Sequence, residues 1–131
     1  MPADAATIRA TVDAYCAAFT RRDRDAYVAL FAEDAWIEDP VGSPRLLGHD
    51  AIGGFFDQSS SLAESIELRQ TGPVRVPSSG GEAAFPMQAR PNIGGTTFCV
   101  DIIDVMTFAD DGKITTMRAF WDPAEMRPAD D

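Results

Sequence analysis

Asp104 is an acidic residue in an otherwise apolar stretch, where its carboxyl group could act as an acid or a hydrogen-bond donor. Alternate residues of a strand share one face, so a strand over 98–106 would place Asp104 among apolar side chains. A carboxyl group buried without a partner tends to stay protonated, and a neutral carboxylic acid can donate a hydrogen bond. Alternatively, Asp104 pairs with a basic side chain or lies near a sheet edge, because structural pairs also perturb carboxyl groups. Spacing alone does not decide between these interpretations.

Asp39 and Tyr15 are two further candidates for acid–base or hydrogen-bonding chemistry. Asp39 ends a predicted strand just before Pro40, which is either ordinary turn chemistry or the position of a general base at the mouth of a pocket. Tyr15 lies on the apolar face of a predicted helix. It is either a core tyrosine or a phenol that donates to a substrate oxygen.

Several other chemistries find no support in the sequence. His49 is the only histidine, which excludes a site built on a pair of histidines, and we expect it at the surface. Cys16 and Cys99 lack metal-ligand spacing and lie in apolar runs, so we expect buried free thiols of a reducing compartment. The sequence contains no P-loop, dinucleotide fingerprint or nucleophile-elbow serine. We therefore expect no metal and no cofactor.

The composition is acidic, with 21 acidic against 11 basic side chains and a net charge of −10. This charge disfavours nucleic acid and anionic membranes, and it fits a neutral apolar ligand as well as many others. The 131 residues have the length of one domain, and 45% of them are hydrophobic. We find no signal peptide and no apolar stretch near the ~20 residues of a membrane span. The sequence therefore predicts a single cytoplasmic domain over 1–131.

Periodicity predicts helices in the first half of the chain and strands in the second. The expected helices are 4–21, with Asp4 as a cap, a short helix after the cap Asp23, and a third from His49 to about Gln58. The expected strands are 35–38, 64–76, 82–90, 96–108 and 113–121. This order predicts an α+β domain in which the helices pack on one face of a curved antiparallel sheet and enclose a pocket.

Together these stretches resemble the bacterial ketosteroid isomerases. The matching segments are DAY at 13–15, LFAEDAWIEDPVG at 30–42, TGPVR at 71–75, VDIIDVMTF at 100–108 and DGKITTMRAFW at 111–121. Each segment alone is weak, but their order and spacing are specific and cover the chain from about Tyr15 to Trp121. The resemblance implies the conical α+β barrel shared with nuclear transport factor two and polyketide cyclases, with the three helices on the concave face of the sheet. It also implies a homodimer.

The resemblance implies a reaction as well, the conversion of a 3-oxo-Δ5-steroid to its Δ4 isomer. Asp39 would move a proton from carbon four to carbon six, while Tyr15 and protonated Asp104 would donate hydrogen bonds to the 3-keto oxygen. The resemblance also implies that Asp104 stays protonated, because members of that family keep such a carboxyl group neutral at neutral pH. Two donors in a dry pocket stabilise the dienolate where its charge develops, and one base can return the same proton. The expected substrate contacts are Phe56, Phe85, Val100, Met117 and Trp121.

Three residues depart from the pattern of these relatives. Phe56 stands where several of them carry a tyrosine whose hydroxyl supports the residue equivalent to Tyr15, which should loosen that donor. Phe31 likewise replaces a possible tyrosine. Pro91 is expected to interrupt a strand, because proline cannot donate to a ladder.

Other activities on the same fold stay open, because a fold alone does not define a function. The alternatives are a polyketide cyclase-like enzyme with a single acidic base and a carrier of apolar ligands without turnover. A dehydratase with a His–Asp pair is disfavoured because only His49 is available. An epoxide hydrolase would need an Asp-Arg-Asp set in the pocket, and neither Arg90 nor Arg118 is clearly predicted to point inward.

Overall fold

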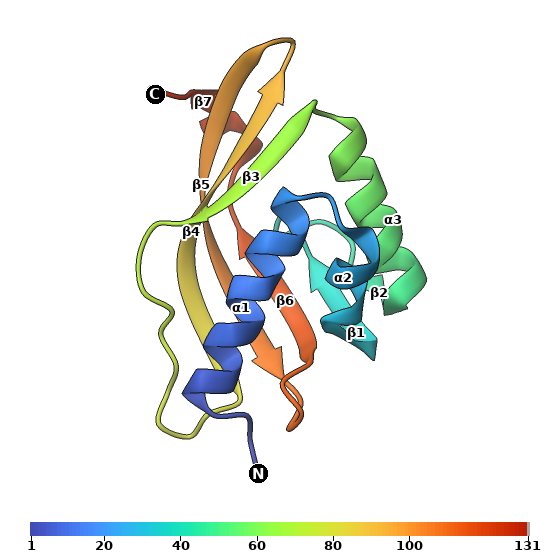
Figure 1. Ribbon diagram of the computed structural model, residues 1–131, viewed down its shortest axis with the longest axis vertical. Helices are drawn as coiled ribbons and strands as arrows, with labels where there is room; N and C mark the ends of the chain where they lie inside the picture. Colours follow the sequence, from blue (N-terminus) through green and yellow to red (C-terminus); the bar gives the residue numbers. More distant parts are fainter. Residues whose placement is uncertain (131) are drawn as a thin grey trace.

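The structure is a computed structural model that describes residues 1–130, with three α-helices and a curved sheet of seven strands (Figure 1). The helices are α1 (Ala5–Thr20), α2 (Arg24–Ala29) and α3 (Gly48–Ser61). The strands are β1 (Phe31–Glu38), β2 (Leu46–Leu47), β3 (Ser65–Gln70), β4 (Glu82–Ile93), β5 (Thr96–Phe108), β6 (Ile114–Phe120) and β7 (Arg127–Pro128). A single turn of 3-10 helix, η1 (Pro123–Glu125), precedes β7. The predicted α+β class is confirmed.

Two aspartates fix the starts of the first two helices, as the sequence predicted. The Asp4 carboxylate accepts a hydrogen bond from the backbone N–H of Thr7 at 2.9 Å. The Asp23 carboxylate accepts one from the backbone N–H of Ala26 at 3.1 Å. These caps satisfy donors that a helix leaves free at its N-terminus, so each helix begins at the next residue.

The sheet is mixed and open, which corrects the prediction of an antiparallel barrel. Its strand order is β2-β1-β6-β5-β4-β3, and β7 pairs with β5 outside this path. The pair β1–β6 is parallel, with Trp36 opposite Thr116, whereas the other pairs are antiparallel. The chain between β1 and β6 passes through α3 and the rest of the sheet, so no hairpin forces them to run antiparallel.

The ends of three strands differ from the prediction, and the first of them, β1, begins at Phe31 rather than at residue 35. β3 ends at Gln70 rather than at residue 76. β4 continues through Pro91 to Ile93, so the proline does not interrupt the strand. Pairing of β4 with β5 runs to Ala89 and resumes at Asn92, and Pro91 instead lies opposite Ile66 of β3. The missing donor is therefore accommodated within the strand without ending it.

The helices pack on one face of the sheet. α1 lies against β3, and α3 lies against β1 (Figure 1). His49 is partly buried, with Nε2 2.8 Å from the backbone oxygen of Phe31, so it links α3 to β1 instead of lying at the surface. Cys16 and Cys99 are buried free thiols, as predicted.

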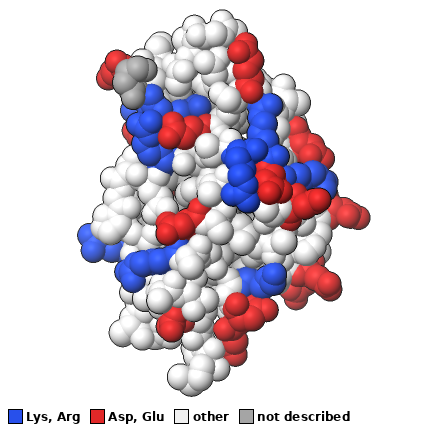
Figure 2. Space-filling model, in the orientation of Figure 1, with Lys and Arg blue, Asp and Glu red and all other residues white. Residues whose placement is uncertain are grey.

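Charged side chains of both signs lie next to one another on the face seen in Figure 2. On this face the basic groups are interspersed with acidic ones and form no extended basic patch. Across residues 1–130, no helix has the length and apolar character needed to cross a membrane.

Candidate active site

A cavity that opens to solvent lies between the helices and the inner face of the sheet, with about 770 Å³ of empty space when its open mouth is included. Most of its walls are apolar, with polar groups only on a few of the residues that line it. The apolar side chains come from α1 and α3, from β3 to β5 and from the segment around η1; they include Phe19, Phe55, Ile66, Leu68, Met87, Val100, Ile102 and Met126. The polar groups are those of Tyr15, Asp39, Ser59 and Trp121. A cavity of this kind suits a neutral apolar ligand that is oriented by a few polar contacts.

Asp39 lies directly after β1, where its carboxylate reaches the cavity wall. The indole Nε1–H of Trp121 donates a hydrogen bond to Asp39 Oδ1 at 2.6 Å. Burial raises the pKa of Asp39 to about 6, against the lowering effect of the Trp121 hydrogen bond. The carboxylate is therefore mainly ionised at neutral pH, yet its pKa is close enough to accept and return a proton efficiently.

Asp104 lies in the middle of β5, between Phe85 of β4 and Ala119 of β6. Its side chain is fully buried, and neither carboxyl oxygen has a hydrogen-bond partner among residues 1–130. Burial raises its pKa well above the usual range, and the charge of Asp39 raises it further. Asp104 thus has neither the basic partner nor the edge position of the alternative interpretation, and burial favours its protonated form.

Tyr15 lies on the inner face of α1 and contributes to the cavity wall. Burial raises the pKa of its phenol well above the usual value, and Tyr27, Asp104 and Asp39 raise it further. The phenol is therefore a neutral hydrogen-bond donor at neutral pH. These electrostatic effects also indicate that the three predicted catalytic groups, Tyr15, Asp39 and Asp104, lie in one neighbourhood.

Asp104 is the deepest of these three groups. Tyr15 and Asp39 line the cavity, whereas Asp104 is enclosed in the sheet beside it. The arrangement combines one ionised base with two protonated donors in an apolar setting. Such a combination can move a proton next to a carbonyl group and stabilise the resulting enolate.

The predicted substrate contacts divide into two groups. Val100 and Trp121 line the cavity. Phe56, Phe85 and Met117 are buried in the core beside it, so their part in binding stays a prediction. Phe56 faces the core, where its ring centroid is 5.2 Å from that of Phe19.

Several residues that line the cavity were not predicted from the sequence, among them Leu62, Ile93 and Met126. Leu62 directly follows α3, and Ile93 ends β4. Both are large apolar residues beside segments predicted as turns. A large apolar residue next to a turn was the sequence feature that could have indicated a place at the cavity rim. Met126 lies in the final turn, for which periodicity gives no orientation.

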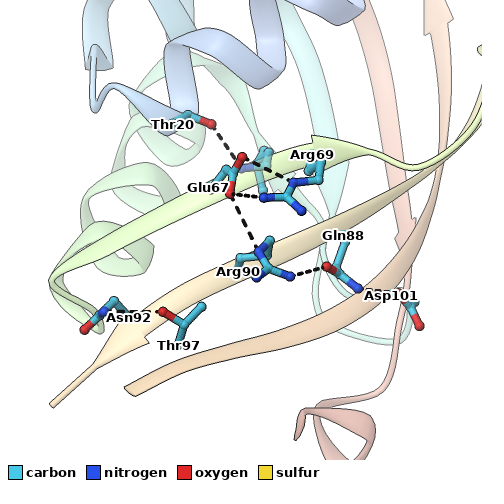
Figure 3. A network of polar contacts seen from close by, with 9 residues as sticks. Thr20, Glu67, Arg69, Gln88, Arg90, Asn92, Thr97 and Asp101 are labelled. Atoms are coloured by element: carbon cyan, nitrogen blue, oxygen red, sulfur yellow. Dashed lines mark hydrogen bonds and ion pairs between the residues drawn. The ribbon is translucent and has the colours of Figure 1, made fainter. Parts of the chain in front are cut away.

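Arg90 and Arg118 do not line the cavity. Arg90 donates to Gln88 Oε1 at 2.7 Å and lies 3.7 Å from Glu67 Oε1, within the polar network of Figure 3. Arg118 donates to Glu38 Oε1 at 2.8 Å. Within residues 1–130, no group of three or more His, Cys, Asp or Glu side chains is arranged to hold a metal ion.

The fold and site define a class of protein: an α+β domain whose helices and curved sheet enclose an apolar cavity with a carboxylate at its wall. The chain belongs to the SnoaL-like domain family, which matches residues 12–117. It is 39% identical over 121 residues to a steroid Delta-isomerase of Nocardioides simplex, covering 92% of this chain and 94% of the relative. These matches confirm the resemblance found in the sequence.

Two solved structures extend the comparison. The epoxide hydrolase/cyclase-like enzyme SalBIII, which has a role in pyran ring formation in the polyether salinomycin, superposes with a TM-score of 0.86 at 26% identity. This match covers 96% of this chain and 98% of SalBIII. RV0760c from Mycobacterium tuberculosis superposes with a TM-score of 0.84 at 25% identity, and the match covers 94% of this chain and 96% of RV0760c.

Proposed function

We propose that the protein is a steroid Δ-isomerase that converts 3-oxo-Δ5-steroids to 3-oxo-Δ4-steroids. The observation that carries this proposal is the carboxyl group of Asp104, fully buried and without a hydrogen-bond partner in residues 1–130. Such a group stays protonated and can donate to an oxygen that gains negative charge. The 39% identical relative named steroid Delta-isomerase supports the same enzyme class, an isomerase.

Asp39 acts as the base in this proposal. Its carboxylate takes a proton from carbon four of the steroid, and the electrons of the broken C–H bond form a dienolate with the 3-keto group. The protonated Asp39 then returns the proton to carbon six, and the keto group re-forms. Because the proton that leaves is the one that returns, the isomerisation balances without a cofactor. A pKa of about 6 for Asp39 suits both steps.

Tyr15 and Asp104 act on the oxygen of the substrate. Their O–H groups donate hydrogen bonds to the 3-keto oxygen as it becomes the dienolate oxygen, and each such donor typically contributes a factor of about 10²–10³ in rate. Asp104 is fully buried and does not line the cavity as Tyr15 does. Its hydrogen bond to the 3-keto oxygen therefore forms only when the substrate is bound. Hydrogen bonds of this kind are commonly long before a substrate is in place.

The decisive test follows the ultraviolet absorbance of the conjugated enone that forms from a Δ5-3-ketosteroid. We expect rapid turnover by the wild-type protein and a loss of about 10²–10⁴ in rate for Asp39→Asn. Asp34→Asn is the matched control, because Asp34 is exposed and lies on β1, the strand that ends just before Asp39. Absence of turnover by a correctly folded wild-type protein would refute the proposal.

A polyketide cyclase-like enzyme is the second candidate, and the similarity to SalBIII favours it. Such an enzyme could use Asp39 as a single acidic base. An epoxide hydrolase with an Asp-Arg-Asp set has less support, because Arg90 and Arg118 form ion pairs outside the cavity wall. Turnover of polyether or polyketide precursors without turnover of ketosteroids would favour this candidate.

A carrier of apolar ligands is the third candidate, and it predicts steroid binding without turnover. A carrier would bind steroids and catalyse nothing, and binding would survive the Asp39→Asn substitution. The isomerase also keeps most of its steroid affinity in this variant, since asparagine has nearly the same shape. The two functions are therefore separated by the turnover of the wild-type protein, with steroid binding measured by calorimetry in both forms.

We also propose a homodimer in the cytoplasm. Ile103 of β5 and Phe120 of β6 are directly paired and are 47% and 42% exposed, which supports an apolar contact surface on the outer side of the sheet. The two free thiols fit a reducing compartment.

A further inference from the structure

Tyr27 of α2 is a buried tyrosine that has no role in the proposed reaction steps of Asp39, Tyr15 and Asp104. Its side chain is fully buried, and its hydroxyl has no hydrogen-bond partner of regular geometry among residues 1–130. A buried hydroxyl without a partner is unfavourable, and a phenylalanine would fill the same apolar space without that cost. The presence of a hydroxyl here therefore requires an explanation.

The neighbours of Tyr27 are almost all aromatic hydrocarbons. Its ring centroid lies 5.1 Å from that of Phe56, 5.2 Å from Phe31 and 5.5 Å from Phe19. The remaining ring is Tyr15, also at 5.5 Å, and it is the only one of the four that carries a hydroxyl. Tyr15 lines the cavity, whereas Tyr27 packs behind it in the core.

The electrostatics point in the same direction as the packing. Burial raises the pKa of Tyr27 well above its usual value, the charges of Asp39 and Asp104 raise it further, and an interaction with the Tyr15 hydroxyl lowers it. The Tyr27 phenol therefore remains protonated at neutral pH, and its ring lies 5.5 Å from the ring of Tyr15. A neutral phenol in this position can donate a hydrogen bond to the oxygen of Tyr15.

We propose that Tyr27 is a positioning residue whose hydroxyl donates to Tyr15 while Tyr15 donates to the dienolate oxygen. A donor behind Tyr15 polarises its O–H bond, because linked hydrogen bonds strengthen one another in an apolar environment. α2 would thereby supply a hydroxyl that Phe56 of α3 lacks. The proposal rests on the proposed isomerase function.

The test combines substitutions that change only hydroxyl groups. We expect Tyr27→Phe to lower kcat about tenfold at an unchanged KM, because the support is used in the transition state. In a Tyr15→Phe background the same substitution should have no further effect, since Tyr27 acts through Tyr15. Phe56 packs against Tyr27, with ring centroids 5.1 Å apart, so a hydroxyl on its ring can replace the one lost in Tyr27→Phe. Adding Phe56→Tyr to Tyr27→Phe should therefore restore much of kcat.

Phe31→Leu is the control for packing. Phe31 contacts the rings of both tyrosines but carries no hydroxyl, so its loss should lower stability and leave kcat within about twofold. A Tyr27→Phe variant with wild-type kcat would overturn the proposal. An equal loss of kcat with and without the Tyr15 hydroxyl would overturn it as well.

Urea unfolding makes the result independent of turnover. The effects of Tyr15→Phe and Tyr27→Phe on the unfolding midpoint should not add in the double variant, because the two hydroxyls interact. Additive effects would contradict the proposal even if the wild-type protein did not isomerise steroids. Conversely, non-additive effects in a protein that does not isomerise steroids would support the interaction between Tyr27 and Tyr15. They would then refute only the isomerase function.

Discussion

At the residue scale, the hydrogen bond from Trp121 to Asp39 governs the pH dependence of the proposed base. The indole N–H stabilises the ionised carboxylate and so holds its pKa down at about 6. In the wild type we expect kcat/KM to fall as the pH drops through about 6, because the protonated form cannot accept a proton. Trp121→Phe should raise the pKa of Asp39 and move this midpoint upward by about one pH unit.

The measurement is the pH profile of kcat/KM between about pH 5 and 9, with Trp36→Phe as the matched control. Trp36 is the other tryptophan and stacks on Arg45, whose guanidinium carbon lies 3.8 Å from the ring centroid. Neither Trp36 nor Arg45 lines the cavity. An unshifted midpoint in Trp121→Phe would show that the indole does not control the base.

The protonated state of Asp104 predicts a trade between stability and activity. The unfolded chain ionises this carboxyl at pH 7, whereas burial in the folded protein raises its pKa well above the ordinary value and favours the protonated form. The raised pKa therefore makes the fold less stable as the pH rises above the ordinary value of 3.8. Asp104→Leu removes an unpartnered buried carboxyl and should stabilise the fold at pH 7 by about 1–3 kcal/mol.

The same Asp104→Leu variant should lose a factor of about 10²–10³ in kcat, because one oxyanion donor is gone. Asp104→Asn keeps an N–H donor and should lose less. Urea unfolding at pH 5 and pH 7 measures the first effect, and the enone assay measures the second. A destabilised Asp104→Leu variant with full activity would mean that Asp104 is ionised and serves the fold.

How far the sequence predicted these residues depends on the kind of signal each gives. The alternation of apolar residues around Asp104 predicted its burial, since a strand has a fixed period. It could not exclude a basic partner, because a partner comes from a distant segment. For Tyr27, the prediction of a short helix after Asp23 did not indicate the aromatic cluster of α1, α2, β1 and α3 residues around it.

At the element scale, the end of α3 and the β4–β5 hairpin form an apolar rim of the cavity. Leu62 and Ile93 both line it, although they are 69% and 43% exposed. A bound steroid would cover these side chains, so Leu62→Ser and Ile93→Ser should each raise KM three- to tenfold at nearly constant kcat. This corresponds to about 1 kcal/mol of lost apolar contact.

Leu47→Ser is the matched control for the rim. Leu47 is 67% exposed, as Leu62 is, but it lies in β2 away from the cavity lining. Steady-state kinetics with a Δ5-3-ketosteroid should therefore distinguish the two leucines. Equal KM values for both variants would place the substrate away from this rim.

The elements themselves were predicted well where local rules apply and less well where pairing decides. Asp4 and Asp23 fixed two helix starts through local caps. The parallel pair of β1 with β6 could not be predicted from either strand alone, because it depends on how α3 returns the chain to the sheet. β4 tolerates Pro91 because the opposing strands, not the proline, set its length.

At the scale of the whole molecule, the outer face of the sheet predicts the oligomeric state. Ile103 and Phe120 are paired across β5 and β6 and both are exposed, so association of two chains would remove adjoining apolar surface from water. We expect the wild type to be a dimer by light scattering, and Ile103→Glu to shift it toward monomer through burial of a charge. Ile93→Glu, a change of equal charge at the cavity rim, should leave the dimer intact. A monomeric wild type, or a dimer that tolerates Ile103→Glu, would contradict this surface as the contact between subunits.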